Sequence, residues 1–305
     1  MSDVKNSAFF SRFMLWVHER FPLANLPLFV VIYFLSMCVA SLENKSMSLM
    51  SIIVGSVLSI SFFLLLRVLD EHKDYKDDCI HHPGRVLQRG VIRLAHLKII
   101  GVICVILQLA GMYWLSPELK PLLISWGLLL FWTGLMTKEF FAPEWLKQRF
   151  FLYAFSHTLI MPFIIWWLAT LTYPHVTLTL PLVLLMFLSF ISGLSFEITR
   201  KCKGPDEDRP EVTTYSQLYG RPLSVFFIIL LLCAMALMQY LLILNGKGAV
   251  PGWFYSISGV LTLFTIGQLV RFLIASNKVN RKRNELMVGL AMMAGYLLCI
   301  VALYD

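Results

Sequence analysis

Nine long apolar stretches constrain the fold of this chain more than any other feature of its sequence. They cover about residues 25–42, 48–69, 94–115, 121–137, 150–172, 177–199, 222–244, 252–274 and 285–303. A helix needs roughly 20 apolar residues to cross a bilayer, and these stretches are close to that length. Only 14% of the 305 residues are charged, whereas a soluble domain carries roughly 25%. The sequence therefore predicts an all-α integral membrane protein with about nine transmembrane helices.

Lysine and arginine are distributed unevenly between the two ends of these stretches. With the N-terminus in the cytoplasm, 23 of the 26 basic residues lie on the cytoplasmic side, and only Lys45, Lys120 and Lys247 lie outside. The positive-inside rule therefore predicts a cytoplasmic N-terminus and cytoplasmic polar loops. Residues 1–24 mix charged and aromatic side chains, which indicates an amphipathic segment at the membrane surface, before a single domain over residues 25–305. The basic residues of these cytoplasmic loops account for the net charge of +8. We therefore expect the lipid bilayer as a partner and do not expect nucleic acid.

The first long polar loop, residues 67–98, begins with an acidic cluster. Asp70, Glu71, Asp74 and Asp78 recur at helical spacing, so one face of a helix would carry all four. Such a face is unfavourable unless cations neutralise it, and carboxylate oxygens suit hard ions such as Mg²⁺. Basic residues surround the cluster, namely Arg67, Lys73, Lys76, Arg85, Arg89 and Arg93. The pattern favours a site for Mg²⁺ and a diphosphate; the alternative is a solvated charged loop between two helices.

A second polar loop, residues 197–221, follows the sixth apolar stretch and corresponds in position to the first loop. It again combines carboxylates with cations, namely Glu197, Asp206, Glu207 and Asp208 with Arg200, Lys201 and Lys203. Two such loops could converge on one anion from opposite sides. Glu197 ends an apolar helix, where a carboxylate is costly unless it is paired or functional. For Asp206 to Asp208, an exposed polar turn is the alternative.

The first loop resembles the first motif of the UbiA superfamily of intramembrane prenyltransferases. That motif reads N-D-x-x-D-x-x-x-D and continues as P-x-R-P-[LI]-x-x-G-x-[IL]. Asp70 stands in the Asn place and Glu71 in the first Asp place, and Asp74 and Asp78 complete the pattern. The continuation is matched by Pro83, Arg85, Leu87, Gly90 and Ile92, with Val86 where the family has Pro.

The second loop resembles the second family motif less well. Glu197-Ile198-x-Arg200 is similar to the opening of that motif, and Thr213-Thr214-Tyr215 is similar to its close. Asp208 falls at the last Asp, whereas Lys201 and Gly204 stand where the family has acids. Two interpretations remain open for this departure. Other acids of the loop could hold a second metal ion, or Lys201 and Lys203 could bind diphosphate directly.

The resemblance implies a UbiA-like bundle around a central lipid-accessible chamber. It also implies Mg²⁺-dependent ionisation of an allylic prenyl diphosphate, with transfer of the prenyl group to a lipophilic, aromatic acceptor. The metal ligands it implies are Asp70, Glu71, Asp74, Asp78, Glu197, Asp206 and Asp208, with Asp70, Asp74 and Asp78 as the catalytic residues. The diphosphate contacts it implies are Arg67, Lys73, Arg85, Arg200, Lys201, Lys203 and Tyr215.

Two other functions compete with prenyl transfer. A terpene cyclase of the same superfamily would ionise the same diphosphate and close the prenyl chain on itself. A transporter is disfavoured because the acidic residues lie at the ends of the apolar stretches, whereas coupling sites lie near the membrane midplane. Within the fifth stretch, Tyr153 is one of several aromatic residues that could face an allylic cation or simply pack. His157 could accept a proton or make a helix–helix hydrogen bond.

Overall fold

The computed structural model describes residues 8–42, 48–208 and 213–304, and all regular structure within them is helical. The spans are α3 (Leu26–Ala40, preceded by η1, Leu23–Asn25), α4 (Leu49–Lys73), α6 (Leu94–Leu115), α7 (Leu119–Thr137), α9 (Phe150–Thr158) continued by α10 (Ile160–Thr172), α11 (Leu180–Arg200), α13 (Arg221–Lys247), α14 (Gly252–Ile274) and α15 (Lys278–Tyr304). Nine segments of these described residues are long and apolar enough to cross a membrane. The predicted all-α fold is confirmed.

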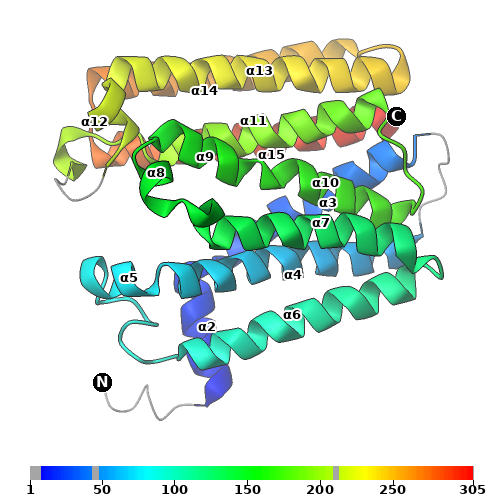
Figure 1. The fold of residues 1–305 in the computed structure, drawn as a ribbon. Helices are drawn as coiled ribbons and strands as arrows, with labels where there is room; N and C mark the ends of the chain where they lie inside the picture. The colour runs from blue at the N-terminus through cyan, green and yellow to red at the C-terminus, as the bar shows by residue number, and fades with distance from the viewer. Residues whose placement is uncertain (1–7, 43–47, 209–212, 305) are drawn as a thin grey trace.

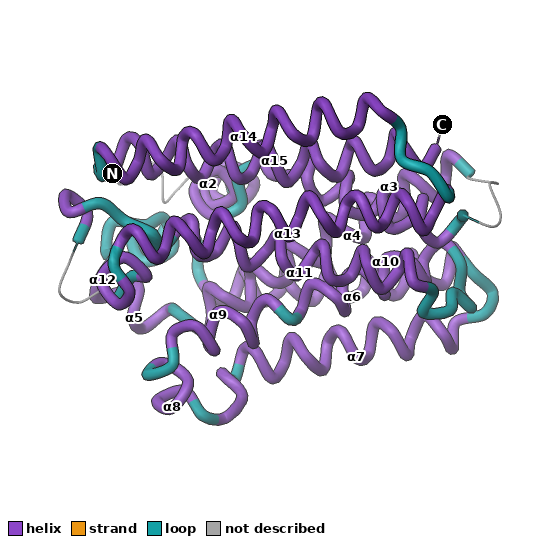
Figure 2. Tube along the Cα trace, turned by 90° about the horizontal axis from the view of Figure 1, so that it is seen from above, coloured by secondary structure: helices purple, strands orange, loops and turns teal. Residues whose placement is uncertain are grey.

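The long helices lie side by side, and the short elements gather at one end of the bundle (Figures 1 and 2). The short elements are α2 (Phe9–Arg20), α5 (Tyr75–His81), η2 (Glu139–Phe141), α8 (Pro143–Lys147), η3 (Pro205–Glu207) and α12 (Tyr215–Tyr219). We call the end that carries α5, α8 and α12 the motif end, because both polar loops lie there. Helix α2 runs across the direction of the spans near this end (Figure 1), packed against α4, the first loop and the start of α6. The chain ends at the opposite end of the bundle.

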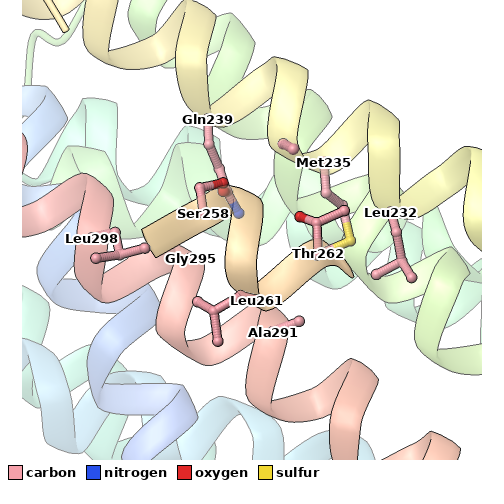
Figure 3. Close-up of a pocket in the computed structure, with 10 residues that line it drawn as sticks. Leu232, Met235, Gln239, Ser258, Leu261, Thr262, Ala291, Gly295 and Leu298 are labelled. Carbon is pink, nitrogen blue, oxygen red and sulfur yellow. The ribbon is translucent and has the colours of Figure 1, made fainter. Parts of the chain in front are cut away.

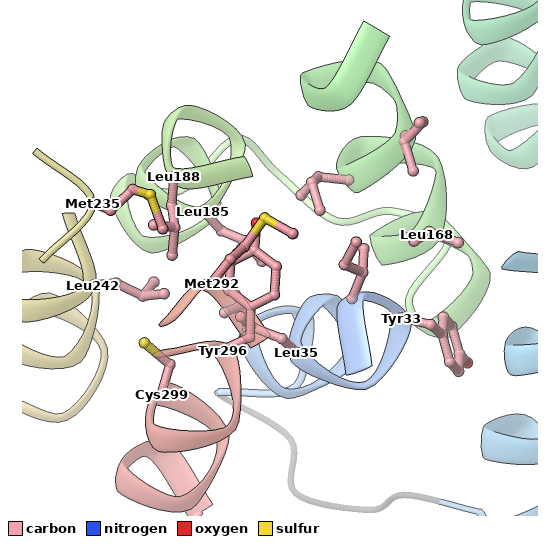
Figure 4. Packing of buried hydrophobic residues seen from close by; sticks show 14 of the residues in the cluster. Tyr33, Leu35, Leu168, Leu185, Leu188, Met235, Leu242, Met292, Tyr296 and Cys299 are labelled. Carbon is pink, nitrogen blue, oxygen red and sulfur yellow. The ribbon is translucent and has the colours of Figure 1, made fainter. Parts of the chain in front are cut away.

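An apolar core holds the bundle together, with α11 packed most closely against α13 and α4 against α6. Figure 4 shows part of this core, where Leu188, Met235 and Tyr296 meet from three helices. Tyr33 is fully buried against Gly55, and a Cβ on that glycine would lie 2.0 Å from the ring. Many large apolar side chains on the outer helix faces are exposed instead, as expected for faces that contact lipid.

A polar group also lies within the apolar part of the bundle, where α13, α14 and α15 meet (Figure 3). The Gln239 amide lies against Gly295, and a Cβ at that glycine would be 2.1 Å from its Nε2 atom. Beside the amide is a cavity of about 20 Å³, with Ser258 and Thr262 in its wall. A space of that size holds about one water molecule, so it is a packing void and not a substrate site.

The structure differs from the expected spans most clearly at three places. The second span was expected to end near residue 69 in a loop, but α4 continues to Lys73 and α5 follows it almost directly. The ninth helix begins at Lys278, before its apolar stretch, because a polar first segment extends the helix outside the apolar region. The fifth span is interrupted at Leu159, where α9 ends and α10 begins. Of the N-terminal segment 1–24, residues 1–7 lie outside the described part of the chain.

Candidate active site

The first acidic motif lies across the joint between α4 and α5. Asp74 is the joint residue, with φ −90° and ψ 2°, so the helix is broken between Asp70 and Asp78. The side chains of Asp70 and Asp74 are 43% and 46% exposed, whereas that of Glu71 is completely buried. The expectation that all four acids share one helix face is therefore wrong, because the break at Asp74 and the packing of Glu71 separate them.

Arginine side chains surround the buried part of this motif. The Oε1 atom of Glu71 accepts hydrogen bonds from Arg67 Nη2 at 2.6 Å and from Arg20 Nε at 2.5 Å. Asp78 accepts one from Arg85, and its Oδ2 atom lies 3.5 Å from Arg20 Nη2. The structure thus places the predicted cations Arg67 and Arg85 beside carboxylates of the motif. Arg20 was missed, because nothing in the spacing of an N-terminal helix reveals where it docks.

The acids of the second loop are all paired, Glu197 with neighbours in sequence and Asp206, Glu207 and Asp208 with residues of other helices. Glu197 pairs with Lys201 at 2.8 Å and with Arg200 at 2.7 Å. Asp208 pairs with Arg221 at 2.9 Å, and Asp206 accepts a hydrogen bond from the backbone N–H of Lys278 at 2.9 Å. Glu207 is bound to Arg281 at 2.6 Å. These contacts tie the loop to α13 and α15, so the segment 206–208 is more than a solvated turn.

A cavity of about 500 Å³ lies between the two loops at the motif end of the bundle. Its wall is formed by Asp74, Asp77, Asp78, His81, His82, Glu139, Phe150, Tyr153, Lys201 and Thr213. The predicted residues that line this space are therefore Asp74 and Asp78 from the first loop and Lys201 from the second. The other predicted site residues are outside this lining set; they are Arg67, Asp70, Glu71, Lys73, Arg85, Glu197, Arg200, Lys203, Asp206, Asp208 and Tyr215.

Lys73 connects Asp74 of the first loop to Tyr153 and Glu139, which also line the cavity. Its ammonium lies 3.2 Å from the Tyr153 hydroxyl, 3.8 Å from Asp74 Oδ1 and 3.9 Å from Glu139 Oε1. The Tyr153 hydroxyl in turn lies 3.4 Å from Glu139. Partial enclosure and the neighbouring Asp77 and Asp78 raise the pKa of Asp74, while Lys73 opposes that rise.

Glu139 reaches the cavity through an uncommon backbone conformation. Glu139, Phe140 and Phe141 have φ values of 48°, 52° and 57°, so three consecutive residues other than glycine are left-handed. Each such residue costs roughly 1–2 kcal/mol. The Phe140 ring packs edge-on against Trp132 and His157, which helps to hold the turn. Glu139 was also missed; the only signal was that it interrupts the fourth apolar stretch beside Lys138.

Tyr215, a predicted diphosphate contact, and His157, for which the sequence left two roles open, both lie close to the cavity. Tyr215 is buried with its ring 4.6 Å from that of Phe150, and burial raises its pKa. Its hydroxyl has no hydrogen-bond partner among the described residues. His157 stacks on Tyr153 at 4.0 Å and its Nδ1 atom lies 2.8 Å from the Tyr153 carbonyl oxygen. That bond lies within one helix, so the structure shows no helix–helix hydrogen bond at Nδ1.

The oxygen donors of the first motif fit Mg²⁺ in kind. Asp74, Asp77 and Asp78 share one cavity wall, and Glu71 Oε2 is buried with no hydrogen-bond partner in the described part of the chain. Hard cations prefer such carboxylate oxygens. Within the described ranges, however, no three Asp, Glu, His or Cys side chains are grouped closely enough to hold a metal ion as they stand. Magnesium binding therefore stays a prediction.

Comparisons with known proteins agree with this architecture. A structure of digeranylgeranylglyceryl phosphate synthase in membranes is similar, with a TM-score of 0.63 and 17% identity over 96% of this chain and 98% of that one. The apo structure of a UbiA homolog from Aeropyrum pernix K1 has a TM-score of 0.62 and 12% identity, over 88% and 96% of the two chains. At such identities the likeness shows the fold. No curated protein sequence matches.

The family assignment comes from the sequence itself. The model of the UbiA prenyltransferase family matches residues 28–300, which is nearly the whole chain and includes both polar loops. The match agrees with the motif resemblance of residues 70–92 and with the nine apolar segments of the described residues. The chain is therefore a multi-pass integral membrane protein that belongs to the UbiA prenyltransferase family.

Proposed function

We propose that this chain ionises an allylic prenyl diphosphate in the cavity at the motif end and transfers the prenyl group to a lipophilic, aromatic acceptor. One observation carries the proposal. Asp74 and Asp78 of the first loop and Lys201 of the second line the same cavity at one end of an apolar helical bundle. Carboxylates that can hold a divalent cation, beside an ammonium that can bind phosphate oxygens, form a site suited to a diphosphate.

The ionisation step breaks the bond between the allylic carbon and the diphosphate oxygen, and the electron pair leaves with the diphosphate. Fixed positive charge around that oxygen lowers the barrier most. Lys201 supplies such charge from the second loop, and Lys73 lies 3.8 Å from Asp74 at the edge of the same space. Mg²⁺, when bound, would add Lewis-acid charge, with Asp74, Asp78 and Asp70 as its proposed ligands.

The allylic cation must then meet the acceptor before it meets water. The Phe150 and Tyr153 rings line the cavity, and aromatic faces stabilise cations. Bond formation between the allylic carbon and the acceptor releases a proton from the acceptor. Glu139 is the proposed proton acceptor because its carboxylate faces the cavity from outside the acidic motif. His157 is the alternative, since its Nε2 atom is buried and has no hydrogen-bond partner in the described residues.

A terpene cyclase is the second candidate function. The departure of Lys201 and Gly204 from the acids expected in the second motif favours a changed reaction. Such an enzyme would use the same ionisation step but no acceptor. The likeness to a digeranylgeranylglyceryl phosphate synthase adds a glyceryl phosphate lipid to the acceptors worth testing.

The test uses the full chain purified into lipid nanodiscs. It is incubated with C10, C15 or C20 prenyl diphosphates, with Mg²⁺ or with EDTA, and with an aromatic acceptor, a glyceryl phosphate acceptor or none. Released pyrophosphate and prenyl products are measured. A Mg²⁺-dependent prenylated acceptor would establish transfer, and a cyclic product without acceptor would establish the cyclase. If no diphosphate is ionised under any condition, the proposal is wrong.

A further inference from the structure

The N-terminal helix α2 docks directly beneath the first acidic motif. Trp16 is completely buried and belongs to a separate apolar cluster with Leu87, Ile92 and Leu97 of the first loop and the helix that follows it. Glu19 accepts a hydrogen bond from the backbone N–H of Val86 at 3.0 Å. Figure 1 shows α2 running across the direction of the long helices near the start of α6. These contacts fix the last turn of α2 against the motif.

Arg20, the last residue of α2, contacts both sides of the joint at Asp74. Its Nε atom lies 2.5 Å from Glu71 on α4, and its Nη2 atom lies 3.5 Å from Asp78 on α5. The side chain is only 15% exposed. A planar guanidinium can bind two carboxylates at once with fixed geometry, which a lysine ammonium does less well.

The other arginines of the site do not make this connection in the contacts of the described residues. Arg67 pairs with Glu71 from the preceding turn of the same helix, and it lies 3.8 Å from Asp70 on that helix as well. Arg85 pairs with Asp78 from the loop that follows α5. Each of them therefore neutralises charge on one side of the joint. Arg20 alone of the three joins the two helices that meet at Asp74.

We propose that Arg20 is a positioning residue that fixes the angle of the α4–α5 joint and thereby holds Asp74 and Asp78 in the cavity wall. Helix α2 precedes residue 28, where the family match begins. The first acidic motif is thus completed by a segment outside the matched family region. The structural half of this inference, that Arg20 fixes the joint, does not depend on the proposed function. The kinetic half, that this position of the acids supports catalysis, rests on the proposed function.

The structural half is tested by hydrogen–deuterium exchange of the full chain in nanodiscs, without substrate. Arg20→Gln should raise the exchange of residues 75–81 by about tenfold, because a hydrogen bond to a charged group opposes local opening. Glu71→Gln should raise the exchange of the same peptides, since it removes the other half of the bridge. His18→Gln, on an exposed position of the same helix, is the control and should leave exchange unchanged. Unchanged exchange of residues 75–81 in Arg20→Gln would overturn the inference.

The kinetic half separates positioning from general stabilisation. Arg20→Gln should lower kcat by about tenfold or more, because small misplacements of catalytic groups have large effects on rate. The KM for the prenyl diphosphate should change little, because Arg20 is absent from the lining of the cavity among the described residues. Arg20→Lys keeps the charge and loses the planar guanidinium, so its kcat should lie between those of the wild type and Arg20→Gln. This variant replaces Arg20→Gln if that protein does not fold. A wild-type kcat in both variants would contradict the inference.

A failure of the proposed function has a different signature. If the wild-type chain releases no pyrophosphate from any prenyl diphosphate, the proposed reaction is wrong and the exchange measurement still decides the role of Arg20. If the wild type is active and exchange is unchanged in Arg20→Gln, the inference fails while the proposed function stands.

Discussion

Asp74 is the acid on which the proposed chemistry depends most, because it faces the cavity from the joint between two helices. Asp74→Asn should lower kcat by at least about 10²-fold, the usual cost of losing one group that stabilises transition-state charge. Its side chain is 46% exposed, so membrane insertion and thermal unfolding should be unaffected. Glu118→Gln, at the exposed pair with His175, is a matched control. Steady-state kinetics in nanodiscs measure the effect, and an active Asp74→Asn would remove this residue from the mechanism.

Lys201 and Lys203 are distinguished by their surroundings, although the sequence treats them alike. The Lys201 ammonium lies 4.8 Å from the Phe150 ring centre and lines the cavity. Lys203 instead contributes backbone groups, with its N–H donating to Ser216 and its carbonyl accepting from Arg221.

Lys201→Ala should therefore lower kcat/KM for the prenyl diphosphate by about tenfold or more, because the ammonium is proposed both to bind the diphosphate and to stabilise the charge that develops on it during ionisation. Lys203→Ala should stay close to wild type. Initial rates over a range of diphosphate concentrations distinguish the two variants. Equal effects would show that the loop acts by its overall charge.

Spacing, charge and the family resemblance together predicted Asp74, Asp78 and Lys201 as site residues, because local sequence determines which loop carries them, and all three line the cavity. Burial of Glu71 could not be predicted in the same way, since it depends on where α2 docks. Arg20 and Glu139 lie far from both motifs in sequence and reach the site only through tertiary packing. Sequence patterns contain no information on such contacts when the residues are charged and solitary.

The turn at η2 has a backbone conformation that its residue types disfavour. Phe140 is left-handed at φ 52°, a conformation that glycine adopts without penalty. Phe140→Gly and Phe140→Ala both lose the ring contacts with Trp132 and His157, and only the glycine variant also loses the conformational penalty. The glycine variant should therefore be more stable than the alanine variant by about 1 kcal/mol.

The same pair of variants tests the role of Glu139. A relaxed turn holds Glu139 less firmly, so the glycine variant should have the lower kcat despite its greater stability. Thermal unfolding and steady-state kinetics on the two proteins provide both measurements. If alanine and glycine variants unfold at the same temperature, the turn stores no strain.

Helical spans were predictable because hydropathy over about 20 residues is a strong signal. The short elements were not. Helix α5 is only seven residues long and polar, so it looks like loop in the sequence. The break at Leu159 has a local signal that the sequence interpretation missed, because Pro162 has no N–H to donate to the carbonyl of Thr158 four residues earlier. The helical state of α5, in contrast, depends on the packing of neighbouring elements.

The orientation of the whole molecule in the membrane can be tested with one native thiol. Cys79 is exposed on α5 at the motif end, and the distribution of basic residues predicts that this end is cytoplasmic. A membrane-impermeant maleimide should therefore label Cys79 in inverted vesicles and not in intact cells, and Cys79→Ser should abolish the signal. Cys202 lies on the same side but is buried, and burial raises its pKa to about 12. It should label only after denaturation.

The ion pairs at the cavity couple the binding of the two proposed ligands, Mg²⁺ and the prenyl diphosphate. Lys73 lies between Asp74 and Glu139, and Lys201 is paired with Glu197. An anion that attracts these ammonium groups leaves the carboxylates with less counter-charge, and a divalent cation on the carboxylates releases the ammonium groups. Reciprocity then requires each ligand to tighten the other by one common factor. Titrations of Mg²⁺ with and without a non-reactive prenyl diphosphate analogue, and the converse, should give that same factor. A factor of one would mean that these ion pairs play no part in the binding of either ligand.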